Sequence, residues 1–209
     1  MSRFDRYLPV GIFVAGLAIV GGYAISHSLQ AQAQDQAQDQ ASAAVDGPGP
    51  NLVIEVAGAA NGTVVIDLLP DVAPLHVAQI TTLAGQGAYD GVVFHRVIDG
   101  FMAQTGDVRF GRAGGDLARA GSGDSDLPNI PAEFSQDLSF QRGVVGMARA
   151  ADPDSANSQF FIMFAPGTFL DGQYTIVGNV ISGMEVVDAV ARGEPPATPD
   201  VMTEVTVQP

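Results

Sequence analysis

Residues 90–107 constrain the fold more than any other part of the chain. Two short runs that alternate apolar and polar residues meet at Asp99-Gly100, and an Asp-Gly pair between such runs is a strong signal for a β-hairpin. Arg96 stands inside the first run, among Phe, Val and Ile, where a core strand would carry another apolar side chain. An arginine in that position indicates that the strand contributes to a functional site and is not only part of the core.

The two-residue period of a β-strand assigns faces to this hairpin. It predicts that Phe94 and Arg96 share one face and that His95 and Val97 share the other. The second strand of the hairpin adds further candidate site residues: Phe101, Met102 and Gln104.

The rest of the chain predicts one mainly β domain preceded by N-terminal segments that are not part of its fold. The 209 residues include 25 Gly and 13 Pro, which favour many turns, and 46% of the residues are hydrophobic, enough for a sizeable core. Strands are expected at 52–56, 63–69, 92–98, 101–105, 143–148, 158–164, 175–181 and 201–207. Short strands separated by turn residues are typical of a barrel or a sandwich.

Two helices are expected, at residues 71–86 and 184–191. Pro74 suits the first turn of the first helix, and Ser182 is the expected N-cap of the second. The apolar face of the first helix is predicted from near-helical spacing to consist of Leu75, Ala78, Ile80 and Leu83.

Charge and composition exclude several functions. The net charge is −14, and nucleic-acid binding needs a basic surface, so no nucleic-acid partner is expected. The chain has no cysteine, which rules out disulfides and thiolate metal sites. Residues 152–157 imitate the start of a calcium loop, but the sixth position is not glycine and Met163 stands where the bidentate Glu belongs. No metal is therefore predicted.

The N-terminal segment predicts export from the cytoplasm. Arg3 and Arg6 precede an uncharged apolar run from Leu8 to Ile25, which is long enough to span a bilayer. We expect residues 1–26 to be a membrane anchor or a signal segment, residues 27–50 a disordered Ala/Gln/Asp/Gly/Pro linker, and residues 51–209 the folded domain. The length favours a retained anchor, while Ala31-Gln32-Ala33 offers a cleavage site, so both outcomes stay open.

Three sequence blocks resemble those of one enzyme family. Residues 94–107 look like the central signature of the cyclophilins, the peptidyl-prolyl cis/trans isomerases, and residues 158–162 and 169–172 look like its two later blocks, in the same order. The likeness covers roughly residues 51–207 and is closest to the bacterial exported branch. It implies a closed eight-stranded antiparallel barrel capped by two α-helices, and an enzyme that needs no cofactor.

The resemblance also assigns roles to individual residues. Arg96 takes the place of the catalytic arginine, and Gln104 and Gln159 take the positions that hydrogen-bond the substrate backbone. The remaining substrate-binding positions line the groove or the proline pocket, and they are Phe101, Met102, Ala148, Phe161, Phe169, Leu170 and Tyr174.

Two of these positions differ from many eukaryotic relatives. Phe169 stands where those have Trp, and Tyr174 where they have His. The loss of the indole N–H predicts weak cyclosporin binding. Arg149 replaces a common Asn, so no side-chain role is carried over to it.

The resemblance implies rotation of X–Pro peptide bonds in unfolded or folding proteins, here exported ones. The expected location is the bacterial cell envelope, with the catalytic domain in the periplasm as a monomer, tethered to the inner membrane through residues 8–25 or soluble after cleavage. A non-catalytic chaperone or peptide-binding module that uses the same groove is the alternative. The feature that discriminates between them is Arg96 with Gln104, which binding alone would not demand.

Overall fold

The computed structural model describes residues 46–209. The expected anchor or signal segment at 1–26, and the linker as far as residue 45, lie outside the described residues. Within 46–209, none of the helices combines the length and the apolar character that a membrane span requires.

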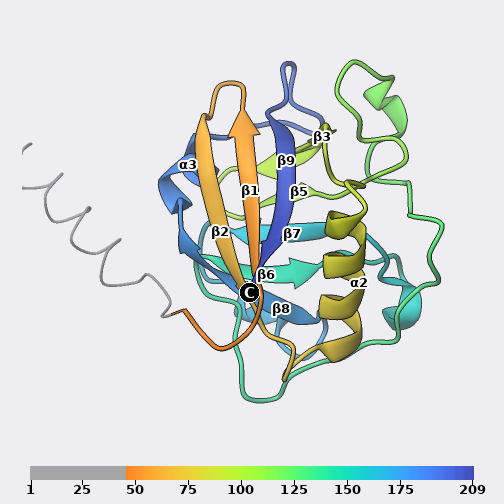
Figure 1. The fold of residues 1–209 in the computed structure, drawn as a ribbon, viewed down its shortest axis with the longest axis vertical. Helices are drawn as coiled ribbons and strands as arrows, with labels where there is room; N and C mark the ends of the chain where they lie inside the picture. Colours follow the sequence, from red (N-terminus) through yellow and green to blue (C-terminus); the bar gives the residue numbers. More distant parts are fainter. Residues whose placement is uncertain (1–45) are drawn as a thin grey trace, which may run out of the picture. The chain divides into compact units, whose positions relative to one another are not determined.

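One antiparallel sheet dominates the described part of the chain (Figure 1). Its order is β3-β9-β1-β2-β8-β6-β7-β5-β4. The strands are β1 Asn51–Ala57, β2 Gly62–Leu68, β3 Val92–Val93, β4 Arg96–Ile98, β5 Met102–Thr105, β6 Val144–Met147, β7 Phe160–Met163, β8 Ile176–Ser182 and β9 Val201–Gln208. The expected mainly β fold is confirmed.

The two edges of this sheet belong to one stretch of chain. The edge strands β3 and β4 are separated only by Phe94 and His95. The Phe94 N–H still donates to Asp200 O beside β9, whereas the next N–H, that of His95, donates to Gln104 O on β5. The chain therefore changes partner within one residue and closes the sheet on itself. Because β3 and β4 act as two halves of one strand, the nine segments form the expected eight-stranded barrel.

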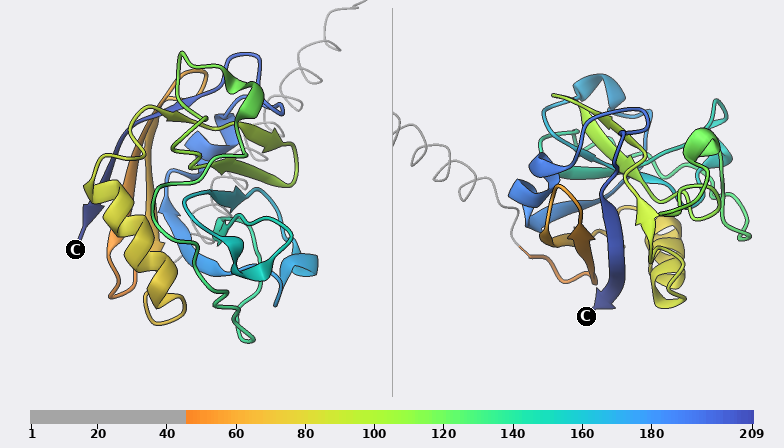
Figure 2. Two further views of the ribbon diagram at one scale, coloured as in Figure 1. Left: turned by 90° about the vertical axis from the view of Figure 1, so that its right-hand side faces the viewer. Right: turned by 90° about the horizontal axis from the view of Figure 1, so that it is seen from above.

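Two α-helices flank the barrel, α2 Pro74–Gly85 and α3 Met184–Ala189, and they lie on different sides of it (Figures 1 and 2). Helix α2 packs against β9, and α3 packs against β2. Three short 3₁₀ turns lie in the connections: η1 Leu117–Arg119, η2 Pro153–Ser155 and η3 Thr168–Leu170.

Two details of the helices differ from the sequence-based expectation. Leu75 and Ala78 are exposed, and the buried residues of α2 are instead His76, Val77, Ile80, Leu83 and Ala84. The predicted apolar face of this helix was rotated relative to the buried face, because the prediction did not allow for a buried histidine. The N-cap of α3 is Gly183, not Ser182, and its φ of 87° is the left-handed conformation that glycine adopts without strain.

Side chains alternate between two apolar clusters on the strands β5, β6 and β7. Ala103, Val145 and Ile162 point into the main core inside the barrel. The alternate residues form a second cluster on the outside of the sheet, which we call the outer cluster. Its buried members are Met102, Phe140, Val144, Phe161, Met163, Leu170 and Ile176, with Ile98, Leu69, Phe101, Ala148 and Tyr174 packed against them.

The predicted faces of the first hairpin strand were wrong. Phe94 and Val97 both lie in the main core, while Arg96 lies on the outer face. Simple alternation fails because the chain changes partner between Phe94 and His95, which interrupts the two-residue period between the two halves of this strand.

Candidate active site

A row of aligned residues crosses the outer face of the barrel. Arg96 on β4 is paired with Gln104 on β5, Gln104 is paired with Phe161 on β7, and Phe161 with Gly146 on β6. Directly opposed residues in a sheet project to the same face. The register therefore places the Arg96 guanidinium and the Gln104 amide beside the outer cluster.

Aromatic rings order the outer cluster. Phe161 stacks on Phe140 with ring centroids 5.7 Å apart, and Tyr174 meets Phe161 edge-on at 5.8 Å. Gly146 makes room for this stack, since a Cβ there would lie 2.5 Å from Phe161 Cζ and 2.6 Å from a Phe140 carbon. A second pair, Phe101 and Phe169, has centroids 5.7 Å apart. Phe169 is 64% exposed, so its ring forms an accessible margin of the apolar surface.

A hydrogen-bond network supports the polar end of the row. Gln104 Nε2 donates to Gln159 Oε1 over 3.0 Å, and Gln159 Nε2 donates to the backbone oxygens of Gly121 at 3.2 Å and Gly123 at 2.9 Å. The fully buried Asp107 accepts the N–H groups of both glycines, at 2.7 and 3.0 Å. The loop that contains Gly121 and Gly123 is thus held through its carbonyls by Gln159 and through its N–H groups by Asp107.

The Arg96 side chain makes one ion pair. Its Nε donates to Glu194 Oε2 over 2.7 Å, and the two side chains are 40% and 54% exposed. Glu194 follows Gly193, whose N–H and C=O exchange hydrogen bonds with Val97 at 2.9 and 2.8 Å. A segment far away in sequence therefore lies alongside β4 and brings a carboxylate to the arginine.

His95 lies beneath this polar end. It is 3% exposed, and burial lowers the pKa of its imidazole below the ordinary 6.5, although the Asp107 carboxylate opposes that shift. The imidazole is therefore neutral at pH 7.

A cavity of about 520 Å³ opens next to Arg96 and Gln104. Residues 117–122 form one wall and Glu194-Pro195 forms another. The outer cluster and this cavity meet at Arg96 and Gln104, so an extended chain could contact both.

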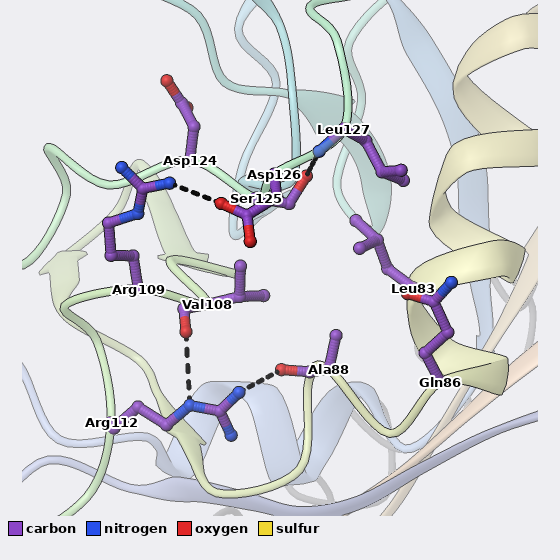
Figure 3. A pocket seen from close by; sticks show the side chains of 10 residues that line it. All are labelled: Leu83, Gln86, Ala88, Val108, Arg109, Arg112, Asp124, Ser125, Asp126 and Leu127. Atoms are coloured by element: carbon purple, nitrogen blue, oxygen red, sulfur yellow. Dashed lines mark hydrogen bonds and ion pairs between the residues drawn. The ribbon is translucent and has the colours of Figure 1, made fainter.

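A second cavity, of about 370 Å³, lies between the end of α2 and residues 108–127 (Figure 3). Its Arg112 donates to the backbone oxygens of Val108 and Ala88, and its Arg109 pairs with Asp126 at 2.8 Å (Figure 3). Both arginines hold the loop together, and none of the residues in the aligned row lines this cavity.

Comparison with known proteins identifies the family. The sequence matches the family described as "Cyclophilin type peptidyl-prolyl cis-trans isomerase/CLD" over residues 52–208. The chain belongs to this cyclophilin family. It is 61% identical over 135 residues to a "Probable peptidyl-prolyl cis-trans isomerase" from Brucella suis, an alignment that covers 64% of this chain and 68% of the relative. It is thus an enzyme of the peptidyl-prolyl cis-trans isomerase class.

Solved structures agree with that assignment. The cyclophilin AquaCyp293 from Hirschia baltica superposes with a TM-score of 0.64 at 30% identity, covering 77% of this chain and 74% of the other. A cyclophilin from Cryptosporidium parvum, determined in the presence of the dipeptide Ala-Pro, shares the fold with a TM-score of 0.65 at 23% identity, covering 76% and 99%.

The structure brings the expected site residues of this cyclophilin to one face. Phe101, Met102, Phe161, Leu170, Tyr174 and Ala148 belong to the outer cluster or pack on it, Phe169 contacts Phe101, and Gln104 contacts Gln159. Ala148 lies just past β6, and its N–H donates to Gln159 O at 2.9 Å.

Sequence reasoning missed Phe140, Asp107 and Glu194. Phe140 and Glu194 lie in irregular segments without periodicity, so no local pattern could indicate that they reach the site. Asp107 ends the family signature, but its four backbone hydrogen bonds depend on how the following loop folds back.

Proposed function

We propose that the protein isomerises X–Pro bonds of proline-containing peptide segments by donating a hydrogen bond from Arg96 to the prolyl nitrogen, with the proline ring seated on the outer cluster. The observation that supports this most directly is the sheet register, in which Arg96, Gln104 and Phe161 oppose one another on one face.

The chemistry requires only that a tertiary amide be allowed to twist. The barrier is about 18–20 kcal/mol because planarity allows resonance between nitrogen and carbonyl. Twisting localises the lone pair on nitrogen and reduces charge separation. A donor aimed at that nitrogen stabilises the twisted state, and arginine is protonated at every physiological pH.

Apolar surroundings act in the same direction. Water solvates the polar planar amide better than the twisted one, so contact with Phe101, Met102 and Phe161 penalises the planar state. Removal of about 5–7 kcal/mol from the barrier corresponds to about a 10⁴- to 10⁵-fold acceleration. A desolvated charged hydrogen bond and the apolar contacts together are of a size to supply it.

The two glutamines fix the peptide. The Gln104–Gln159 hydrogen bond uses the Nε2 donor of Gln104, so Gln104 Oε1 remains oriented to accept an N–H from the substrate backbone. When the residues beside the proline are held in place, rotation about the X–Pro bond moves only the carbonyl that precedes the proline.

The test is a protease-coupled isomerisation assay with R96A and R96K. We expect R96A to keep the fold, which circular dichroism checks, and to lose about 10²- to 10³-fold in kcat/KM, the size of one charged catalytic donor. R96K recovers little, because an ammonium lacks the planar fork. Normal turnover of R96A would overturn the mechanism.

Two further measurements separate this mechanism from its alternatives. The pH profile of kcat/KM should be flat between about pH 6 and 9, where arginine does not titrate, and a bell shape would indicate a histidine instead. The non-catalytic chaperone would be favoured by two results together. The wild type would show no isomerase turnover, and both the wild type and R96A would suppress aggregation of an unfolded client protein.

We also propose that the enzyme acts on exported proteins, held in the bacterial cell envelope by its N-terminal segment. The support is the apolar run from Leu8 to Ile25 behind Arg3 and Arg6, together with the absence of cysteine. Cell fractionation and the mass of the mature protein test this. Recovery in the cytoplasmic fraction would contradict it, and the mass distinguishes a retained anchor from a cleaved signal.

A further inference from the structure

Glu194 stands directly across from Arg96. Gly193 and Val97 form an antiparallel bridge with both backbone hydrogen bonds, so the residue after Gly193 opposes the residue before Val97. The Glu194 carboxylate accepts from Arg96 Nε over 2.7 Å in this cross-strand position.

The segment that carries Glu194 is held at both ends. The buried Asp200 accepts the N–H of Ala191 at 2.7 Å with one carboxylate oxygen and the N–H of Ala60 at 2.7 Å with the other. Gly193 has a φ of 146°, and a Cβ there would lie 2.6 Å from Pro196 Cα. The backbone therefore presents Glu194 in a fixed place rather than on a free loop.

The size of the interaction indicates what it does. Both side chains are partly exposed, and exposed ion pairs contribute only about 0–1 kcal/mol to stability. The direction of the hydrogen bond has the larger consequence. A guanidinium is planar, so occupying Nε fixes its plane and leaves the Nη1 and Nη2 edges for a substrate.

We propose that Glu194 is a positioning residue for the isomerase reaction: it holds Arg96 by Nε so that the Nη groups meet the prolyl nitrogen. This inference rests on the proposed role of Arg96. It also assigns the wall of the 520 Å³ cavity formed by Glu194-Pro195 to the reaction. A substrate that passes through this cavity meets an arginine whose orientation is already set.

The experiment compares E194A and E194Q in the coupled assay. We expect E194A to lower kcat by about tenfold while KM changes less than about twofold, because misorientation of a donor acts on the transition state. E194Q keeps an oxygen that can accept from Nε, and it recovers most of the lost kcat. An E194A enzyme with unchanged kcat overturns the proposal.

Asp99 provides a matched control. It pairs with Arg192 Nε at 3.1 Å, so it joins the same segment to the same hairpin through a similar ion pair. D99A should keep wild-type kcat. If D99A loses as much activity as E194A, Glu194 only anchors the segment and the positioning role is wrong.

Two measurements separate this inference from the mechanism on which it rests. In an R96K background, E194A should cause no further loss, because its effect passes through the guanidinium. The Arg96 Nε–H resonance in ¹⁵N NMR should shift in E194A and not in D99A. A fully active R96A overturns the role of Arg96, whereas an inactive R96A beside a fully active E194A overturns Glu194 alone.

Discussion

Gln104 Nε2 donates to Gln159 Oε1 over 3.0 Å, and this hydrogen bond joins the row that contains Arg96 to the loop that walls its cavity. Gln159 is 8% exposed and uses both ends of its amide, since its nitrogen donates to two loop carbonyls. A single buried side chain therefore couples the orientation of Gln104 to the position of the loop.

Gln159→Leu tests that coupling. The change leaves the buried Gly123 carbonyl, the partly buried Gly121 carbonyl and the Gln104 amide without their partner, and each buried unsatisfied group costs about 1–3 kcal/mol. We expect lower stability, at least a tenfold loss of kcat/KM and faster hydrogen exchange in residues 119–123. Gln79→Leu, on α2, is a comparison that removes amide bonds to Pro128 O and Asn157 O away from the row. Equal activity in the two variants would contradict the coupling.

Gly146→Ala tests the packing of the outer cluster. The added methyl meets the Phe161 and Phe140 rings at less than 3 Å, so the stack must shift. Overpacking of this kind costs about 1–3 kcal/mol, and we expect activity to fall because Phe161 is displaced. Gly85→Ala is the control: nothing lies within 4 Å of a Cβ there, and alanine in a helix should add about 0.5–1 kcal/mol. Urea denaturation measures both, and a G146A enzyme as stable as wild type would disprove the tight fit.

The buried histidines predict how stability depends on pH. Burial lowers the pKa of both His76 and His95 below 6.5. Near and below that pH, these histidines therefore bind more protons in the unfolded chain than in the folded chain. The stabilisation is complete above pH 6.5 and is lost as the pH falls below it, with a slope of at most about 1.4 kcal/mol per pH unit for each histidine.

Urea denaturation at pH 7.5 and 5.5 measures this slope, and His95→Gln should reduce it. Asp67 and Asp124 act in the opposite direction, because burial raises the pKa of each above 3.8. The stabilisation that they give is complete below pH 3.8 and is lost as the pH rises above it. An unfolding free energy that does not change between pH 7.5 and 5.5 would show that the histidines are not held neutral by burial.

Phe169→Trp tests the exposed margin of the apolar surface. The indole N–H adds one donor, worth about 0.5–1.5 kcal/mol, so cyclosporin should bind about three- to tenfold more tightly. The native chain contains no tryptophan, so the new indole also reports binding by its fluorescence. Phe169→Leu, which removes the ring, should not tighten binding. Unchanged affinity in the tryptophan variant would mean that the drug does not reach residue 169.

The barrel could be predicted from the sequence because its strands carry strong local signals. In the strand expected at 158–164, Phe160 lies in the main core and Phe161 in the outer cluster, as the two-residue period requires, and Asp99-Gly100 marked the hairpin. The failures have a common physical cause. The break at Phe94 and the arrival of Glu194 beside Arg96 are set by pairings between segments far apart in sequence, and no local period records them.

Closure of the sheet also decides how a client can be recognised. Many peptide-binding proteins capture an extended ligand by adding it as another strand along an open edge. In residues 46–209, the edge strands β3 and β4 lie where the sheet closes on itself, and the backbone of Gly193 pairs with the other side of β4. With those edges paired, we expect recognition of a client to rest on side chains, those that contact the proline and the glutamines that contact the peptide backbone beside it.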